Sequence, residues 1–395
     1  MKRLSSIALA SALAIASFGA QAAYGLSYTS SSTDIQTGSF NGMSWEARSL
    51  LVGMTPTSGF ASPAVGGGGD PLFFPSTNKG GVAALIMDYG AQGRFICSGS
   101  LLTDSASILT AAHCVRPRNG VLPATTAYFF TGDPNERTPF SPNALTITVN
   151  HQMIHPGYTG QVVDHNDIAL LKLSTTASGV QTYGLYTHND IAGQTYNVAG
   201  YGGRSTVGGD GATGGANAGT GFLREGNNRY EYRMGDPIFS QTPGNGWQTV
   251  YPSNPNIAFS YLADFDSGRI ANDMACNVAQ ASNLAGAAGA VFCNTGVGAR
   301  EVGTAGGDSG GPQFLNGMIS SVTSYGLTFG AAWGDCRAGL QSSCGEFNGF
   351  VPVYHHQEWI TQAMAVPEPS AWALMAAGLF GVGAVARRRL RSAQA

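Results

Sequence analysis

The chain has 395 residues, of which 56 are glycine, 43% are hydrophobic and 11% are charged, and its formal net charge is −3. The hydrophobic share excludes a chain that is disordered throughout, and the abundant glycine with few charges excludes a coiled coil. Because the interior holds no block of Lys or Arg, we expect no nucleic-acid partner.

The N-terminal end has the pattern of a secretory signal peptide over residues 1–22. Lys2 and Arg3 are followed by an apolar run from Ile7 to Phe18, and Ala20-Gln21-Ala22 is a small-x-small cleavage site. We therefore expect export and cutting by a signal peptidase.

Residues 23–79 are rich in Ser, Thr and Gly, and we interpret them as an extended or loosely packed leader, with a propeptide as an alternative. From residue 80 onward, short β-type runs are separated by turn residues, which favours an all-β sandwich or barrel. The predicted strands are 82–87, 107–110, 144–149, 168–173, 256–261 and 318–322. Residues 202–221 are predicted to be a Gly-rich surface loop, and 354–365 a short C-terminal helix.

The C-terminal end, residues 366–391, has three parts. Pro367-Glu368-Pro369 precedes an apolar stretch, 371–386, and four arginines close the segment. A plain tail anchor is one interpretation, because 16 apolar residues nearly span a bilayer. The order also resembles the PEP-CTERM sorting signal. That resemblance implies an exosortase-type enzyme that cuts the tail, membrane contact only before this processing, and a final location on the cell surface or outside the cell.

Six cysteines lie between the two end segments. An even number in an exported chain favours disulfides over metal ligation, and the chain has no C-x-x-C motif. We therefore expect no metal and no cofactor. Six cysteines allow 15 pairings, and proximity in sequence favours three of them: Cys97–Cys114, Cys276–Cys293 and Cys336–Cys344.

Three short segments could together carry nucleophilic catalysis. Ser309 lies within Gly306-Gly307-Asp308-Ser309-Gly310-Gly311-Pro312, where glycines let the backbone approach a reacting carbonyl. His113 precedes Cys114, and Asp167 precedes an apolar run. A serine nucleophile needs a base, and the base needs a carboxylate that fixes its tautomer.

The order His, Asp, Ser and the flanking residues resemble the chymotrypsin-like serine peptidases over residues 80–364. The resemblance implies two six-stranded antiparallel β-barrels, with a boundary near residue 200 and the active site between them. It makes His113 the general base, Asp167 its orienting carboxylate and Ser309 the nucleophile of an endopeptidase. The N–H groups of Gly307 and Ser309 would form the oxyanion hole.

The same resemblance assigns substrate-binding residues. Ser324-Tyr325-Gly326 matches the strand that pairs with the substrate backbone, and Gly303 stands at the base of the specificity pocket. Because Gly303 carries no charge, we expect an uncharged P1 residue, although Glu301 is close in sequence. The first two disulfides match pairs of the family. No cysteine stands directly before Gly306, so the family's pocket disulfide is missing.

Activation and insertions are where the chain departs from the family. The family's new amino terminus pairs with the Asp before the Ser, here Asp308, and the nearest match to its start is Ala64-Val65-Gly66-Gly67. The chain could also be active uncut. Residues 202–275 fit the family poorly and could hold insertions.

Two other functions and a calcium site stay open. A non-catalytic surface or matrix protein could use the same fold, and the segment around Ser309 also fits the G-x-S-x-G pattern of an esterase, with Asp335 and His355 in the order Ser, Asp, His. Asp264 and Asp266 could belong to a calcium site. On the peptidase interpretation, the partners are protein or peptide substrates and the chain is a monomer.

Overall fold

A computed structural model describes residues 35–49, 52–54, 71–130, 144–205, 216, 219–240, 246–281 and 284–366. The predicted signal peptide, the candidate start 64–67 and residues 367–391 of the predicted sorting segment lie outside these ranges. Among the described residues, no helix is long and apolar enough to cross a membrane, and the predicted span 371–386 is not among them.

The first sheet has seven strands and is closed. Its order is β3-β5-β4-β7-β8-β9-β6, and an additional pairing of β5 with β6 joins six of the strands into a barrel, to which β3 adds at the edge of β5. The bounds are β3 Val52–Met54, β4 Val82–Asp88, β5 Arg94–Leu101, β6 Ser107–Thr110, β7 Ala124–Phe130, β8 Ala144–Ile154 and β9 Ala169–Leu173.

The second sheet has nine strands and forms a half-barrel. Its main path is β11-β10-β14-β15-β16-β13-β12, and its two end strands are consecutive in the chain, joined by Tyr230 and Glu231. The bounds are β10 Thr195–Gly200, β11 Arg224–Arg229, β12 Tyr232–Arg233, β13 Tyr261–Asp264, β14 Pro312–Leu315, β15 Met318–Thr328 and β16 Phe347–Pro352. The predicted all-β, two-barrel class is confirmed, with the second half less regularly closed than the first.

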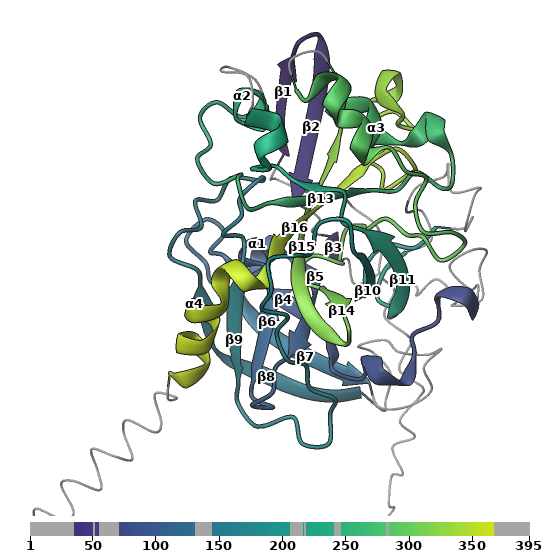
Figure 1. Cartoon of the computed structure of the whole chain (residues 1–395). Helices are drawn as coiled ribbons and strands as arrows, with labels where there is room; N and C mark the ends of the chain where they lie inside the picture. Colours follow the sequence, from purple (N-terminus) through teal and green to yellow (C-terminus); the bar gives the residue numbers. More distant parts are fainter. Residues whose placement is uncertain are drawn as a thin grey trace, which may run out of the picture.

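Helices are short except at the C-terminal end, where α4 (Val353–Ala365) confirms the predicted helix. Val353, Ile360 and Ala363 pack into the core of the first barrel, although α4 follows the last strand of the second sheet. In Figure 1, α4 lies beside β9 at the lower left of the molecule. The helix therefore ties the two halves together. The other α-helices among the described residues are α1 (Ala112–Val115), α2 (Trp247–Val250) and α3 (Met274–Ala279), and short 3-10 turns accompany them.

The segment interpreted as an extended or loosely packed leader contains two paired strands. β1 (Ile35–Phe40) and β2 (Met43–Ser49) form a hairpin at the top of Figure 1. Its turn is Asn41-Gly42, with φ of +47° and +81°, as a tight hairpin turn requires. β2 also pairs with β15, so the hairpin extends the second sheet.

The prediction of a strand at 256–261 is wrong, because residues 256–259 form turns and only Tyr261 begins a strand, β13. The preceding residues turn, since the side chain of Asn254 accepts a hydrogen bond from the N–H of Asn256 (2.9 Å). The N–H of Ser260 in turn donates to the carbonyl of Ile257 (2.9 Å). Local side-chain bonding thus outweighs the β propensity of this run.

Candidate active site

Ser309 lies in a tight turn before β14, and glycine at the next position makes that turn possible. Gly310 has a φ of +80°, and a Cβ there would lie 2.0 Å from Oγ1 of Thr110, which belongs to the first barrel. A residue larger than glycine would push the two halves apart at this point. The glycines around Ser309 thus permit the close approach of the nucleophile loop to β6.

His113 and Asp167 come from the ends of adjacent strands of the first barrel. His113 lies on α1, directly after β6, and Asp167 stands two residues before β9, which pairs with β6. The Nδ1 of His113 lies 2.6 Å from Oδ2 of Asp167, and the backbone N–H of His113 donates to Oδ1 (2.8 Å). Both side chains are buried.

This geometry sets the tautomer of the histidine. An ionised carboxylate only accepts hydrogen bonds, so Nδ1 must carry the proton that it donates to Asp167. The Nε2 atom of neutral His113 is then a base with a free lone pair. Asp167 Oδ2 also accepts a hydrogen bond from the hydroxyl of Ser324 (2.5 Å), which fixes the carboxylate further.

The second half contributes Ser309, and the two halves meet at its backbone. The hydroxyl of Ser309 lies 3.5 Å from the carbonyl oxygen of Ser324 on β15, while the carbonyl of Ser309 accepts from the N–H of Ser98 on β5 (2.8 Å). Ser324 thus contacts both Asp167, the partner of His113, and Ser309, so the three predicted residues lie in one region between the two sheets.

Ser98 is a residue of this site that sequence analysis missed. Its hydroxyl donates to the carbonyl of Gly307 (2.9 Å) and accepts from the N–H of Tyr201 (2.9 Å). Gly307, a predicted oxyanion-hole residue, has a φ of +101°. Ser98 thus fixes the loop that carries both predicted oxyanion donors, and the segment Cys97-Ser98-Gly99 gave no local signal for this role.

Three of the predicted substrate-binding residues, Ser324, Tyr325 and Gly326, lie on β15, and Gly303 lies in the loop before Ser309. Tyr325 is fully buried, and its hydroxyl lies 2.6 Å from the hydroxyl of Ser260. Its backbone lies between two neighbours, Gly349 of β16 and Ser49 of β2. Gly326 follows on β15. Gly303 lies beside Phe265, whose Cβ would be 3.4 Å from a Cβ on the glycine.

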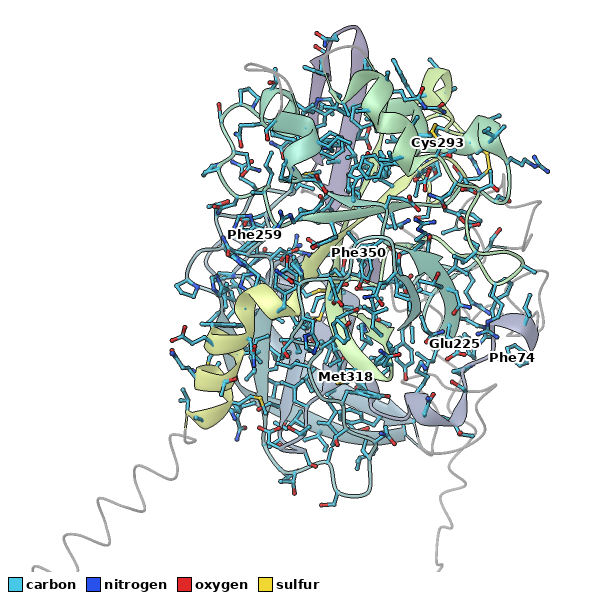
Figure 2. The ribbon with its side chains drawn as sticks, viewed as in Figure 1. Phe74, Glu225, Phe259, Cys293, Met318 and Phe350 are labelled. Carbon is cyan, nitrogen blue, oxygen red and sulfur yellow. A yellow bond between two sulfur atoms is a disulfide. The ribbon has the colours of Figure 1, made fainter. Side chains whose placement is uncertain are left out.

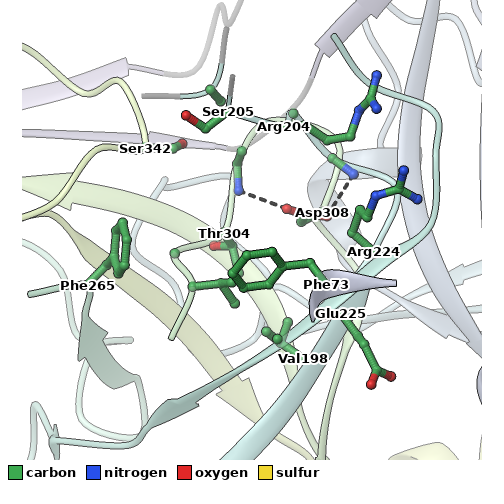
Figure 3. Close-up of a pocket in the computed structure, with 18 of the residues that line it drawn as sticks. Phe73, Val198, Arg204, Ser205, Arg224, Glu225, Phe265, Thr304, Asp308 and Ser342 are labelled. Atoms are coloured by element: carbon green, nitrogen blue, oxygen red, sulfur yellow. Dashed lines mark hydrogen bonds between the residues drawn. The ribbon is translucent and has the colours of Figure 1, made fainter. Parts of the chain in front are cut away.

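A cavity of about 130 Å³ lies beside the nucleophile loop (Figure 3). Gly303 and Asp308 line it, whereas Ser309 and the β15 residues do not. The carboxylate of Asp308 accepts from the N–H groups of Gly202 (2.7 Å) and Ala305 (2.9 Å), and burial raises its pKa to about 6. Asp308, the predicted activation partner, is thus held by backbone amides in the uncut chain.

Two arginines line the same cavity, and Figure 3 shows Arg204 above Asp308 and Arg224 to its right. Burial lowers the pKa of both Arg204 and Arg224 to about 10, and each guanidinium lies over the ring of Phe222. Glu225 points away from the cavity and pairs with Lys79 (3.3 Å) and Arg300 (2.8 Å).

Five carboxylates are buried together next to this cavity, and sequence analysis named three of them: Asp264, Asp266 and Glu301. They are Glu231, Asp264, Asp266, Asp273 and Glu301. Burial, followed by the charge of Asp266, raises the pKa of Glu301 to about 8, and burial raises that of Asp266 to about 6. Within the described chain, Oδ2 of Asp266 and Oε2 of Glu301 have no hydrogen-bond partner.

Four histidines form a second cluster that the sequence did not reveal, where α4 meets the loop before Asp167. His155, His165, His355 and His356 have ring centroids 4.7 to 5.4 Å apart in neighbouring pairs. His355 also stacks on Phe259, labelled in Figure 2, at 3.6 Å.

The esterase alternative requires Asp335 to orient His355. The carboxylate of Asp335 instead accepts hydrogen bonds from the hydroxyls of Thr328 and Ser343, so these contacts do not form the triad that an esterase would need.

The three disulfides predicted from sequence proximity are all present: Cys97–Cys114, Cys276–Cys293 and Cys336–Cys344. In the described residues, both groups of three potential metal donors contain disulfide sulfurs. Those sulfurs are not thiolates, so neither group offers three ligands. The first disulfide fixes α1, and with it His113, to β5.

Two parts of the chain match models of known families or motifs. The trypsin family model matches residues 76–214, which include His113 and Asp167 but end before Ser309. Residues 365–389 match the PEP-CTERM protein-sorting motif. No curated protein sequence matches the chain.

Among solved structures, the chain is similar to neuropsin, a serine protease expressed in the limbic system of mouse brain, with a TM-score of 0.47 and 19% identity. That match covers 74% of this chain and 98% of neuropsin. The matches to the trypsin family model and to the PEP-CTERM protein-sorting motif agree with the two resemblances expected from the sequence.

Proposed function

We propose that this protein is an exported serine endopeptidase that uses His113, Asp167 and Ser309. The observation that carries the proposal is the two-point contact of His113 with Asp167, at 2.6 and 2.8 Å, beside the Ser309 turn. The sorting motif indicates export and a cell-surface or extracellular location, with which three disulfides agree.

The proposed reaction uses the His113 tautomer that carries its proton on Nδ1. Nε2 of His113 takes the proton of the Ser309 hydroxyl as Oγ attacks the substrate carbonyl carbon, and the backbone donors of Gly307 and Ser309 stabilise the oxyanion. His113 then gives the proton to the leaving amine as the C–N bond breaks. A water molecule, activated by the same histidine, hydrolyses the acyl-enzyme.

The expected substrates are proteins or peptides with an uncharged P1 residue. Gly303 offers no carboxylate to a basic side chain, and the adjoining wall carries Phe265. Glu301 has a pKa of about 8, raised by burial, so near neutral pH it is mostly protonated and does not attract a cationic side chain. A non-catalytic binding role would not require the hydrogen-bonded pair of His113 and Asp167 beside Ser309.

Labelling with a fluorophosphonate probe, read by peptide mapping, tests the proposal. We expect modification of Ser309, lost in both Ser309→Ala and His113→Ala, and a fall in peptide hydrolysis of roughly 10³-fold or more in each variant. His188→Ala, on an exposed loop, is the matched control and should keep both. Labelling that survives His113→Ala would contradict the peptidase pairing and favour an esterase.

A further inference from the structure

The buried carboxylates beside the cavity place several negative charges in one region of the second half. This acidic cluster consists of Glu231, Asp264, Asp266, Asp273 and Glu301. Among the described residues, none of the ion pairs joins a member of the cluster to Lys, Arg or His. Burial, with the charges of Asp273 and Asp266, raises the pKa of Glu231 to about 8 against the opposing charge of Arg229. Because buried charges in proteins are normally paired or bound to a metal ion, the cluster calls for a cation.

Two members of the cluster, Asp266 and Glu301, each carry an oxygen that can accept such a cation. Asp266 is 1% exposed and Glu301 is 4% exposed. Within the described chain, Oδ2 of Asp266 and Oε2 of Glu301 have no hydrogen-bond partner. The other oxygen of Glu301, Oε1, accepts from the N–H of Asp266 (3.1 Å), so the two residues are in direct contact. A buried carboxylate oxygen without a donor or a cation costs free energy, which a bound ion would recover.

Tyr232, on β12, directs its hydroxyl toward the same cluster. The residue is 0% exposed, and its hydroxyl has no hydrogen-bond partner in the part of the chain that the structure describes. Burial, followed by the charges of Asp264 and Glu231, raises the pKa of Tyr232, so the hydroxyl lies near both carboxylates. Buried tyrosine hydroxyls usually have a partner, and this one is therefore a separate indication that the cluster takes up a ligand.

Gly296 keeps the open oxygen of Glu301 clear of side chains. Its φ is +70°, and a Cβ on it would collide with Oε2 of Glu301. A glycine at this position therefore leaves the carboxylate oxygen accessible from the loop. The same loop is exposed at Thr295, Gly298 and Ala299, so the site lies close to solvent on this side.

The donor atoms of the cluster select the class of ion. Carboxylate and hydroxyl oxygens are hard ligands, which suit Ca²⁺ or Mg²⁺ rather than a thiolate-binding metal. In the described chain, no three members of the cluster bring their oxygens within range of a single ion, so water or main-chain carbonyls have to complete the shell. Ca²⁺ accepts such a mixed and irregular shell of roughly six to eight oxygens, whereas Mg²⁺ demands a nearly ideal octahedron.

We propose that the acidic cluster is a Ca²⁺ site, with Asp266 and Glu301 as direct ligands and the other three carboxylates as the negative charges around the ion. The proposal does not rest on the proposed function. The expectation of no metal came from the cysteines, whereas these ligands are carboxylates that only the fold brings together. Asp266 follows Phe265, and Glu301 stands two residues before Gly303, so the ion would hold together two sides of the predicted specificity pocket.

Unfolding of the full-length chain in urea, with mild detergent present, tests the proposal after the metal has been removed with EDTA. We expect about 5 mM Ca²⁺ to raise the urea midpoint above its value in EDTA, because an exported protein needs a Kd of only about 0.1–1 mM. The same concentration of Mg²⁺ should have little effect. Binding itself is measured with Tb³⁺, whose luminescence Tyr232 and Trp247, with ring centroids 5.9 Å apart, should sensitise and Ca²⁺ should quench by displacement.

Asp266→Asn and Glu301→Gln separate a ligand from a residue that only supports the fold. Each should weaken the competition of Ca²⁺ with Tb³⁺ at least about tenfold, because the site loses one ligand charge. Each should also be at least as stable as the wild type in EDTA, because it removes one charge from a mutually repelling group. Glu358→Gln, on the exposed face of α4, is the matched control and should keep the Ca²⁺ response of the wild type.

Three results would overturn the proposal. The first is an equal urea midpoint in Ca²⁺ and in EDTA, with no Tb³⁺ signal that Ca²⁺ displaces. The second is equal stabilisation by Mg²⁺, which would contradict a calcium-type shell. The third is an unchanged Ca²⁺ affinity in both cluster variants, which would place the ion elsewhere on the chain. None of these results bears on labelling of Ser309, so the proposed function is tested separately.

Discussion

At the scale of single residues, one buried hydroxyl joins the two halves at the active site. Ser98 on β5 bonds to Gly307 and Tyr201 through its hydroxyl, and to Ser309 through its N–H. These contacts bring three chain segments to one point, with a separation of 209 residues between Ser98 and Gly307. No local sequence pattern could reveal such a contact, because the partner residues are defined only by the fold.

Ser98→Ala should weaken both stability and catalysis. The substitution leaves the buried Gly307 carbonyl and Tyr201 N–H each without this partner, which costs about 1–3 kcal/mol of unfolding free energy. The loop with the oxyanion donors loses its anchor, so we expect kcat to fall more than KM changes. Urea unfolding and peptide hydrolysis measure the two effects.

Ser39→Ala, an exposed serine on β1, is the control and should change neither quantity. Ser98 is a positioning residue that does not touch the substrate in this scheme. A variant with lowered stability but wild-type kcat would show that Ser98 supports only the fold.

At the scale of elements, the patterns that could be predicted are local ones. The apolar runs of β4, β6 and β9 and the amphipathic α4 have their own signals in sequence, and disulfide neighbours suggested the pairings. The hairpin β1–β2 was missed because Ser and Thr dominate its surroundings, although Asn41-Gly42 and the alternation of Met43, Trp45 and Ala47 are hairpin signals. Its place on β15 depends on contacts across almost 280 residues, which sequence spacing does not encode.

The docking of α4 predicts a sensitivity to acid. His356 on α4 is buried, and its ring Nε2 lies 2.6 Å from the backbone carbonyl of His165. Burial, with the neighbouring rings of His155, His165 and His355, lowers the pKa of His356 to about 3. Arg233 adds positive charge near His355. Protonation in the folded state is therefore strongly disfavoured.

The sign of the effect follows from the protons bound. Between pH 6.5 and 3 the unfolded state carries a proton on His356 that the folded state lacks, so stability falls as the pH falls. We expect the wild type to lose about 2 kcal/mol more than His356→Gln between pH 7.5 and 5. His151→Gln, exposed on β8, should behave as the wild type in the same urea titrations. Parallel pH profiles for all three proteins would contradict the prediction.

At the scale of the whole molecule, the all-β fold class and the chain order of the candidate triad could be predicted from the sequence. The clustering of buried carboxylates could not. The order His113, Asp167, Ser309 can be read directly from the sequence, and the all-β class follows from short apolar runs separated by turn residues. The clustering of Glu231, Asp264, Asp273 and Glu301 is different, because these residues span 70 positions and meet only when β11 to β13 and the loop before Ser309 fold together. Spacing therefore gave a hint only for Asp264 and Asp266, which are neighbours in sequence.

This acidic cluster makes the second half respond to pH in the opposite sense to α4. The pKa of Glu301, about 8 in the fold, lies above its unfolded value, so between about pH 4.5 and 8 the folded state holds a proton that the unfolded state has released. Its contribution to stability is present at low pH and is lost as the pH rises. We expect urea unfolding in EDTA to show wild-type stability falling from pH 6 to 8.5, by on the order of 1 kcal/mol per pH unit at most.

Glu301→Gln should flatten that fall, because glutamine keeps the shape and cannot ionise. Glu358→Gln, the same substitution at an exposed position of α4, should keep the wild-type slope. If Glu301→Gln instead lost stability at pH 8.5, the ionised carboxylate would have a cationic partner, and the cluster would not be a source of repulsion. With the expected result, the two groups act in opposite directions: the buried histidines lower the stability as the pH falls below about 6.5, and the buried carboxylates lower it as the pH rises toward 8.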